Sequence, residues 1–266
     1  MAKAHSTERD ALNDFASREI ALESKTKRVF VSGTGPAVIV MAEMPGISPE
    51  VARFARWVRD AGFTVYMPVL FGDPGAPLTS TLKIIGTIVK GCISREFHAF
   101  RANSSGPIAV WLRALARLAL SEAGGKGVGA IGMCFTGNFA LSMMLEPAML
   151  APVLSQPSLP IGKAGGMHIA PEELAAVKKR MDEEDLTVLA YRFDGDSLCK
   201  AARFEAYQAA LGDRFVPTVI DDKDANPGAR MKNPHSVVTH HLINETGQPT
   251  KKAVDDILAF FDRRLH

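Results

Sequence analysis

Short apolar, β-rich runs alternate with longer segments of helical periodicity along this chain of 266 residues. Alternation of this kind predicts an α/β protein in which a mostly parallel central sheet is flanked by helices. The predicted strands are Lys27–Ser32, Ala37–Ala42, Thr64–Met67, Gly127–Ile131, Ala148–Leu154, Thr187–Tyr191 and Phe215–Ile220. The predicted helices are Pro49–Ala61, Leu82–Phe100, Ser105–Ala123, Phe135–Leu145, Pro171–Glu183, Lys200–Leu211 and Gln248–Leu265.

The connection between the first two predicted strands is short. Only Gly33–Pro36 separates them, which predicts an antiparallel hairpin, whereas later connections carry helices and imply parallel neighbours. An antiparallel first strand pair followed by βαβ units fits the sheet of an α/β hydrolase better than a nucleotide-binding sheet. We expect residues 25–266 to form one such domain, preceded by an N-terminal helical extension at residues 1–24.

Charge and apolar run lengths argue against several partners. Lys and Arg (31) nearly balance Asp and Glu (29), and no basic stripe suited to nucleic acid occurs. Apolar runs such as Gly35–Ala42 are far shorter than the roughly 20 residues that span a bilayer, so we expect no membrane partner. Residues 1–24 carry charges throughout, unlike a signal peptide, which predicts a cytoplasmic protein.

Three cysteines, Cys92, Cys134 and Cys199, occur without a C-x-x-C pair. An odd number of widely spaced cysteines argues against both a disulfide framework and a zinc site. No His/Cys cluster has the spacing of metal ligands, so we expect neither a metal nor another cofactor. One of the cysteines is then a candidate for chemistry.

The segment Val128–Ala140, VGAIGMCFTGNFA, is the most informative about chemistry. An apolar strand runs through Gly132 to Cys134 and then directly into a predicted helix, which is the layout of a nucleophile elbow with Cys in place of Ser. Small residues are needed there because strand and helix backbones nearly touch. A helix N-terminus favours a thiolate, and the amide of Phe135 can face a developing oxyanion. The alternative is a buried packing cysteine.

A nucleophile of this kind needs an acid and then a histidine further along the chain. The loop FDGD after the strand Thr187–Tyr191 offers Asp196, with Asp194 as the second choice. The loop NPHS offers His235, and His240 and His241 compete with it. Each of these residues alone is equally compatible with a solvated loop position, and the order and strand-end placement of the set favour catalysis.

Glu43 ends the apolar run Val38–Ala42 and precedes Met44, where a strand-to-helix loop contributes an oxyanion-hole amide in hydrolases of this type. A carboxylate at this point can accept a hydrogen bond from a resting thiol. A solvent-facing glutamate is the alternative.

Several segments together resemble the dienelactone hydrolase family of α/β hydrolases. They are VIVMAEMPGIS, ARWVRDAGFTVYMPVLFG, GMCFTG, FDGD and NPHSVV, and the resemblance covers about residues 27–265. It implies that Cys134 is the nucleophile, Asp196 the acid and His235 the base. It also implies that Glu43 contacts the resting thiol and that the oxyanion-hole amides belong to Met44 and Phe135.

The chain departs from the family pattern at two places. Thr136 stands where the family usually has a glycine of the elbow. The arginine and tyrosine that hold a substrate carboxylate in the family have no clear match in Leu82–Ala102, where Arg95 and Arg101 are the available candidates and exposed helix charges are the alternative.

The function that these residues predict is hydrolysis of a small-molecule carboxylic ester or lactone by a Cys-His-Asp triad through a thioester acyl-enzyme. An acyltransferase or thioesterase would need the same triad. A catalytically inert α/β-hydrolase-like binding protein is the non-enzymatic alternative. The sequence leaves open whether the chain forms a homo-oligomer.

Overall fold

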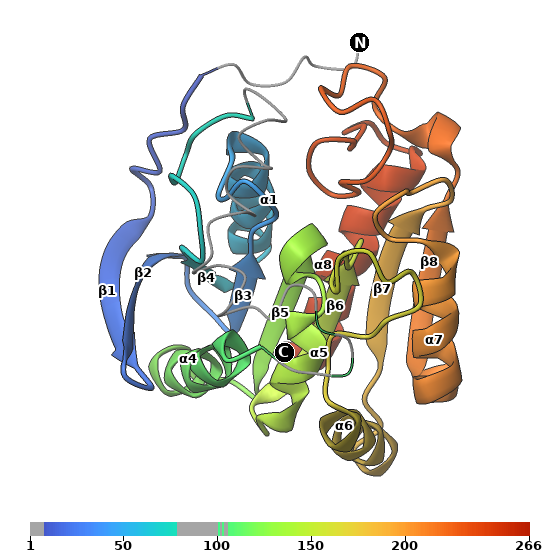
Figure 1. Cartoon of the computed structure of the whole chain (residues 1–266). Coiled ribbons are helices and arrows are strands. Elements are labelled where there is room, and N and C mark those ends of the chain that lie inside the picture. Colours follow the sequence, from blue (N-terminus) through green and yellow to red (C-terminus); the bar gives the residue numbers. More distant parts are fainter. Residues whose placement is uncertain (1–7, 79–100, 102, 104–105) are drawn as a thin grey trace.

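The computed structural model describes residues 8–78, 101, 103 and 106–266 (Figure 1). Its centre is a sheet of eight strands in the order β1-β2-β4-β3-β5-β6-β7-β8. The strands are β1 (Ala16–Leu22), β2 (Lys25–Ser32), β3 (Ala37–Met41), β4 (Thr64–Pro68), β5 (Val128–Met133), β6 (Met149–Ser155), β7 (Val188–Phe193) and β8 (Phe215–Ile220). Every predicted strand is present with bounds within two residues of those expected.

The expected antiparallel part of the sheet is present, but it involves other strand pairs than the predicted one. β2 pairs antiparallel with β1 and with β4, while β3 lies parallel between β4 and β5. The predicted hairpin between β2 and β3 is therefore wrong. A short loop permits a hairpin without requiring one, and here β4 inserts between the two strands because all five residues of β3 are buried and belong in the sheet centre.

The expected helix over residues 1–24 is wrong where the structure describes this segment, because Ala16–Leu22 form the edge strand β1. Ahead of the strand, Leu12 and Phe15 are buried in the core. Asp14 forms ion pairs with two arginines of helix α1, at 2.7 Å to Arg56 and 2.6 Å to Arg59. This segment is packed into the domain rather than appended to it.

The long helices are α1 (Pro49–Asp60), α4 (Ile108–Ala123), α6 (Pro171–Glu183), α7 (Ala201–Leu211) and α8 (Pro249–Leu265). Helices α1, α6 and α8 begin with proline, which suits the first helical position because its missing N–H would have no intrahelical acceptor. The predicted helix Leu82–Phe100 lies outside the described residues. In the part of the chain that is described, no helix is both long and apolar enough to cross a membrane.

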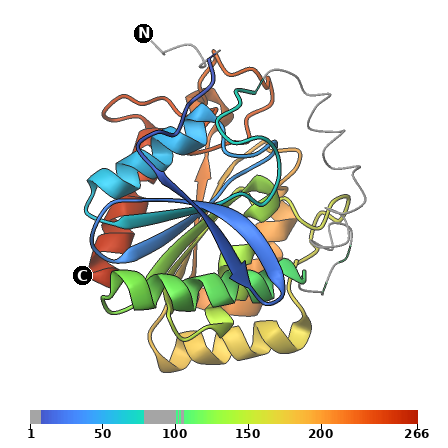
Figure 2. The ribbon, with the colours of Figure 1, turned by 90° about the vertical axis from the view of Figure 1, so that its left-hand side faces the viewer.

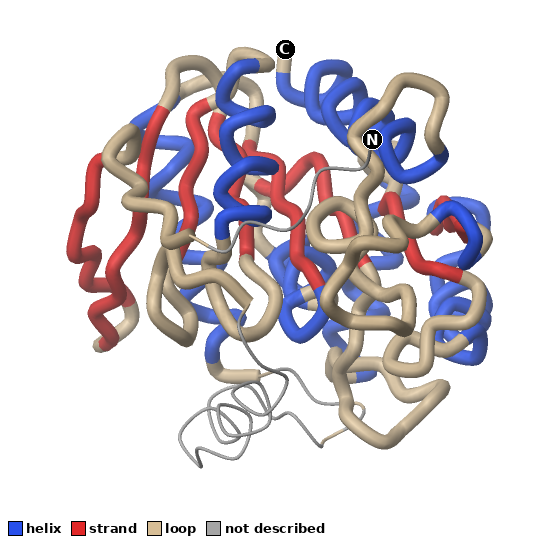
Figure 3. The backbone as a smooth tube through the Cα atoms, turned by 90° about the horizontal axis from the view of Figure 1, so that it is seen from above, coloured by secondary structure: helices blue, strands red, loops and turns tan. Residues whose placement is uncertain are grey.

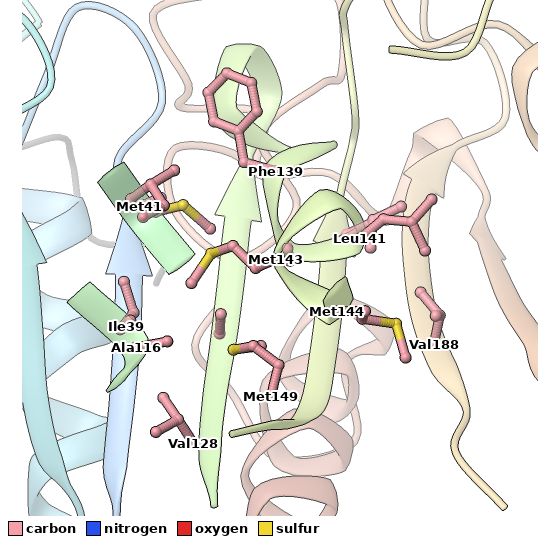
Figure 4. Close-up of a cluster of buried hydrophobic side chains, with 14 of the residues drawn as sticks. Ile39, Met41, Ala116, Val128, Phe139, Leu141, Met143, Met144, Met149 and Val188 are labelled. Atoms are coloured by element: carbon pink, nitrogen blue, oxygen red, sulfur yellow. The ribbon is translucent and has the colours of Figure 1, made fainter. Parts of the chain in front are cut away.

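Helices cover both faces of the sheet (Figures 1 and 2). Helices α1 and α8 pack on one face with the segment before β1, and α4, α6 and α7 pack on the other. Figure 4 shows part of the core on the face that α4, α6 and α7 cover, where methionines such as Met41, Met143, Met144 and Met149 fill the space over the sheet. Flexible thioether side chains suit this role because they adapt to irregular gaps.

The predicted helix Phe135–Leu145 is not continuous. Residues Cys134–Thr136 form a 3-10 turn, Phe139–Ser142 a single α-helical turn (α5), and Met143–Leu145 a second 3-10 turn. Three short turns lack a long row of aligned peptide dipoles, so local amide groups rather than a helix dipole act on Cys134.

The loops that follow strands β3 to β8 gather at one end of the sheet, which Figure 3 shows from above. These loops begin at the carboxyl ends of mutually parallel strands. Ligand sites in open α/β sheets form at such an edge. The predicted site residues lie in these loops: Glu43 and Met44 after β3, Cys134 and Phe135 after β5, Asp196 after β7 and His235 after β8. Arg101 is the exception among those that the structure describes.

Truncation of Phe15 tests whether residues before β1 belong to the core. Phe15→Ala should lower the free energy of unfolding by about 3 kcal/mol, because it leaves a cavity beside α1. Urea denaturation at neutral pH measures this change. Val110→Ala is the matched control, since Val110 is an exposed apolar residue of α4. A loss below about 1 kcal/mol for Phe15→Ala would show that the segment is only loosely attached.

Candidate active site

The turn between β5 and the following helical turns has the geometry of a nucleophile elbow. Cys134 has φ of +52°, in the left-handed region that side chains with a Cβ rarely adopt. A Cβ at Gly132 would lie 2.1 Å from the Thr136 carbonyl oxygen, and one at Gly137 would lie 2.6 Å from the Pro157 Cα atom. The turn therefore requires glycine on both sides of Cys134, which is partly exposed at its tip.

Thr136, which departs from the family pattern, has a structural role in this turn. Its buried hydroxyl accepts a hydrogen bond from the Met133 amide at 2.9 Å. The same hydroxyl lies 3.0 Å from the Met41 carbonyl oxygen and 3.2 Å from that of Ala42, so it can donate to the end of β3. The hydroxyl of Thr136 therefore connects the elbow to the neighbouring strand.

Asp196 and His235 come together although they are 39 residues apart. The Nδ1 atom of His235 lies 2.7 Å from Oδ2 of Asp196, and both residues are buried. The other carboxylate oxygen of Asp196 accepts hydrogen bonds from the amides of Leu198 at 2.8 Å and Cys199 at 3.0 Å. Asp194, the second choice, points outward and pairs with Arg192 at 3.5 Å.

The His235 imidazole also interacts with the Cys134 sulfur. Burial opposes the charged form of His235, but the charge of Cys134 and hydrogen bonds to Asp196 and Cys134 outweigh it. The pKa of His235 is therefore raised well above its usual value. A histidine held this way is a stronger base than a free imidazole.

The competing histidines lie beside this pair in different surroundings. His241 Nδ1 accepts the amide hydrogens of His235 at 3.3 Å and Ser236 at 3.0 Å, and its Nε2 atom lies 2.9 Å from the Met231 carbonyl oxygen. Burial lowers the pKa of His241 to about 4. The neutral ring therefore fixes the turn that carries His235. His240 lies between two buried carboxylates, 3.8 Å from Glu43 and 3.6 Å from Glu50.

Glu43 is buried and faces the segment that carries His235. Its Oε2 atom accepts hydrogen bonds from Ser236 Oγ at 2.5 Å and from Gln156 Nε2 at 3.4 Å. Its Oε1 atom accepts one from the Thr239 hydroxyl. Among the hydrogen bonds of the described residues, none joins Glu43 to the Cys134 thiol. The carboxylate instead connects three loops of the site.

Two polar residues after β6 belong to the site although sequence analysis did not select them. Ser158 Oγ lies 3.5 Å from Cys134 Sγ and 3.4 Å from His235 Nε2. Gln156 joins Glu43 to the His235 segment, since its Oε1 atom accepts the Val237 amide hydrogen at 3.4 Å. The only available signal was their position directly after a predicted strand, in the glycine- and proline-rich stretch 156–166.

The remaining predicted residues have separate outcomes. Met44 and Phe135 follow Glu43 and Cys134 in the chain and are buried, and their role as oxyanion-hole residues stays a prediction. Arg101 is exposed, and no described interaction joins it to Cys134, Glu43 or His235. Arg95 and Cys92 lie outside the described residues.

Cys199, the other described cysteine, is fully buried, and burial raises the pKa of its thiol far above the usual range. A thiol in this environment is inert. Within residues 8–78 and 106–266, His, Cys, Asp and Glu side chains form no group of three or more that could hold a metal ion.

Solved structures with the same fold include several esterases. A Klebsiella pneumoniae protein assigned as a dienelactone hydrolase aligns with a TM-score of 0.62 at 15% identity, covering 94% of this chain and 98% of its own. The Pyrococcus furiosus esterase Pf2001 aligns with a TM-score of 0.58 at 14% identity, covering 95% and 93%. A cold-adapted esterase from an Arctic intertidal metagenomic library aligns at 0.57 and 11% identity, covering 99% and 100%. The sequence matches no curated protein.

The sheet order, the elbow and the loops at the carboxyl ends of the strands define an α/β hydrolase. The model of the dienelactone hydrolase family matches residues 25–157, which is half of the chain. The chain belongs to the dienelactone hydrolase family of carboxylic ester hydrolases.

The low pKa of His241 predicts a specific loss of stability in acid. A histidine of the unfolded chain titrates near 6.5 and the folded one near 4, so between these values the unfolded state binds more protons. Stability therefore falls as the pH falls through this range, by about 3 kcal/mol for this residue at pH 4.

His241→Asn keeps an acceptor for the two amides without the titration. Urea denaturation at pH 7 and pH 4 should show a smaller acid loss in the variant, by about 3 kcal/mol. If the two proteins lose equal stability between these pH values, His241 is not the buried neutral group described here.

Proposed function

We propose that this chain hydrolyses a small carboxylic ester or lactone with Cys134 as nucleophile, His235 as general base and acid, and Asp196 as the carboxylate that orients His235. The observation that carries the proposal is the 2.7 Å contact between His235 Nδ1 and Asp196, in a histidine that also forms a hydrogen bond with the sulfur of Cys134, a cysteine in an elbow turn. This is the arrangement of nucleophile, base and orienting acid that acyl transfer needs.

The first half of the reaction forms a thioester. His235 Nε2 takes the thiol proton, and the thiolate of Cys134 attacks the carbonyl carbon to give a tetrahedral oxyanion. We assign the stabilising hydrogen bonds to the amides of Phe135 and Met44. When the oxyanion collapses, the carbon–oxygen bond to the alcohol breaks and His235 returns its proton to the leaving oxygen.

The second half releases the acid. His235, again neutral, takes a proton from a water molecule that attacks the thioester carbonyl. Collapse of the second tetrahedral intermediate breaks the carbon–sulfur bond, and the protonated His235 returns the proton to Cys134. Asp196 stabilises the imidazolium in both halves through the same hydrogen bond. Neither half needs a metal or an organic cofactor as reactant.

Replacement of the nucleophile is the most direct test. Cys134→Ala should lower kcat/KM for a chromogenic aryl ester by at least about 1,000-fold, because no other group can form the acyl-enzyme. Cys199→Ala is the matched control and should retain hydrolysis, since Cys199 is buried and inert. Mass spectrometry of the wild-type protein mixed with the ester should detect the acyl group on the Cys134 peptide. Equal turnover by Cys134→Ala and wild type would overturn the proposal.

We further propose that Glu43 is a positioning residue that acts through the His235 segment. Its two oxygens accept hydrogen bonds from Gln156, Ser236 and Thr239, which lie in two loops on either side of Cys134. An amide in place of the carboxylate has one acceptor oxygen and an NH2 group that faces donors. At least one buried donor is then left without a partner, which costs about 1–3 kcal/mol.

Glu43→Gln should therefore lower kcat about tenfold, much less than loss of Cys134. The rate of thiol alkylation against pH, measured without substrate, should also change because the His235 segment shifts relative to the sulfur. Glu146→Gln is the matched control, since Glu146 is a buried carboxylate paired with Arg117 at 2.6 Å. Unchanged hydrolysis together with an unchanged alkylation profile would remove Glu43 from the site.

A further inference from the structure

Ser158 is the one side chain of the described residues that lies within hydrogen-bonding distance of both the Cys134 sulfur and the free nitrogen of His235. Its Oγ atom is 3.5 Å from Sγ and 3.4 Å from Nε2. His235 also interacts directly with the sulfur. The sulfur, the imidazole nitrogen and the hydroxyl therefore form a closed group of three.

The backbone holds Ser158 in this position without help from a ligand. The Ser158 amide donates a hydrogen bond to the Cys134 carbonyl oxygen at 2.9 Å. One residue earlier, the Cα atom of Pro157 packs so closely on Gly137 that a Cβ there would lie 2.6 Å away. The loop after β6 is thus fixed against the elbow, and the hydroxyl is buried beside the sulfur rather than mobile in solvent.

The hydroxyl has more acceptors than protons. Its hydrogen can point to the Gln156 carbonyl oxygen at 3.0 Å, to the Cys134 sulfur or to a neutral His235 nitrogen. When His235 is protonated, Nε2 becomes a donor and no longer competes for this hydrogen. Of the two remaining acceptors, a thiolate carries a full charge and a carbonyl oxygen does not, so the thiolate forms the stronger hydrogen bond.

We propose that Ser158 is a further catalytic residue, whose hydroxyl donates a hydrogen bond to the Cys134 thiolate when His235 is protonated and so stabilises the thiolate–imidazolium pair. In the neutral pair the thiol donates to His235, and the hydroxyl of Ser158 returns to the Gln156 carbonyl oxygen. The role deepens the proposed function and rests on it for its catalytic meaning. The effect on the thiol itself can be measured without any substrate.

The test is the rate of iodoacetamide alkylation as a function of pH, followed on the Cys134 peptide by mass spectrometry. Ser158→Ala should raise the midpoint of this profile by about one pH unit, so that roughly tenfold less thiolate reacts below it. Ser142→Ala should leave the midpoint unchanged, because Ser142 is a buried serine of α5 whose hydroxyl contacts no described partner.

Ser158→Thr and Ser158→Val form a second pair of nearly equal shape, which separates the hydroxyl from packing. The threonine variant should stay close to the wild-type midpoint and the valine variant should shift as alanine does. Superimposable profiles for threonine and valine, or a midpoint that falls in Ser158→Ala, would overturn the proposal, the latter because it would mean that the hydroxyl opposes the thiolate.

Hydrolysis of the aryl ester by Cys134→Ala, measured beside the alkylation profile of Ser158→Ala, keeps this proposal distinct from the proposed function. A shifted alkylation profile in Ser158→Ala together with normal hydrolysis by Cys134→Ala would retain the hydrogen bond to the thiolate and reject Cys134 as nucleophile. An unshifted alkylation profile in Ser158→Ala together with inactive Cys134→Ala would reject the hydrogen bond to the thiolate and retain Cys134 as nucleophile.

Discussion

The left-handed backbone of Cys134 is the constraint on which the rest of the site depends. A turn this sharp brings the end of β5 into contact with the residues that follow, so positions 132 and 137 have no space for a Cβ. A non-glycine residue keeps a strained backbone with positive φ only where surrounding contacts hold that conformation in place. Here the Thr136 hydroxyl binds the end of β3, and the loop after β6 packs on Gly137 and donates a hydrogen bond to the Cys134 carbonyl oxygen.

The two buried carboxylates of the site differ in what they face, and this difference separates their roles. Asp196 directs one oxygen to two backbone amides and the other to the imidazole of His235. Glu43 directs its oxygens to two hydroxyls and an amide side chain. In the proposed function, the first arrangement stabilises a charge that appears on His235, and the second fixes the positions of the loops that Glu43 joins.

Most of the fold could be predicted because strands buried on both faces leave a strong apolar signal, as in β3 and β5, and because proline marks helix starts such as Pro171. Strand β1 could not be predicted in this way, since its sequence ASREIAL alternates only weakly between polar and apolar residues and most of the strand is exposed at the sheet edge. The hairpin error has a similar origin. Loop length is a local property, whereas the insertion of β4 between β2 and β3 is decided by burial across the whole sheet.

The chain order of Cys134, Asp196 and His235 was visible in the sequence because each follows a strand. Ser158 and Gln156 were not visible as site residues. A serine or glutamine after a strand is ordinary, and its meaning comes from contacts with residues 24 to 113 positions away. The role of Glu43 was anticipated only in part: Glu43 and Cys134 follow neighbouring parallel strands, but the carboxylate directs its oxygens to other loops.

The anchors of Glu43 lie 193 and 196 residues further along the chain. Contacts between such distant residues form late in folding, because a long loop must close before they stabilise anything. During synthesis the strand bearing Glu43 and the elbow bearing Cys134 leave the ribosome long before the histidine segment that completes the site. A growing chain therefore has the elbow of Cys134 before it has His235 and the two hydroxyl groups that Glu43 binds.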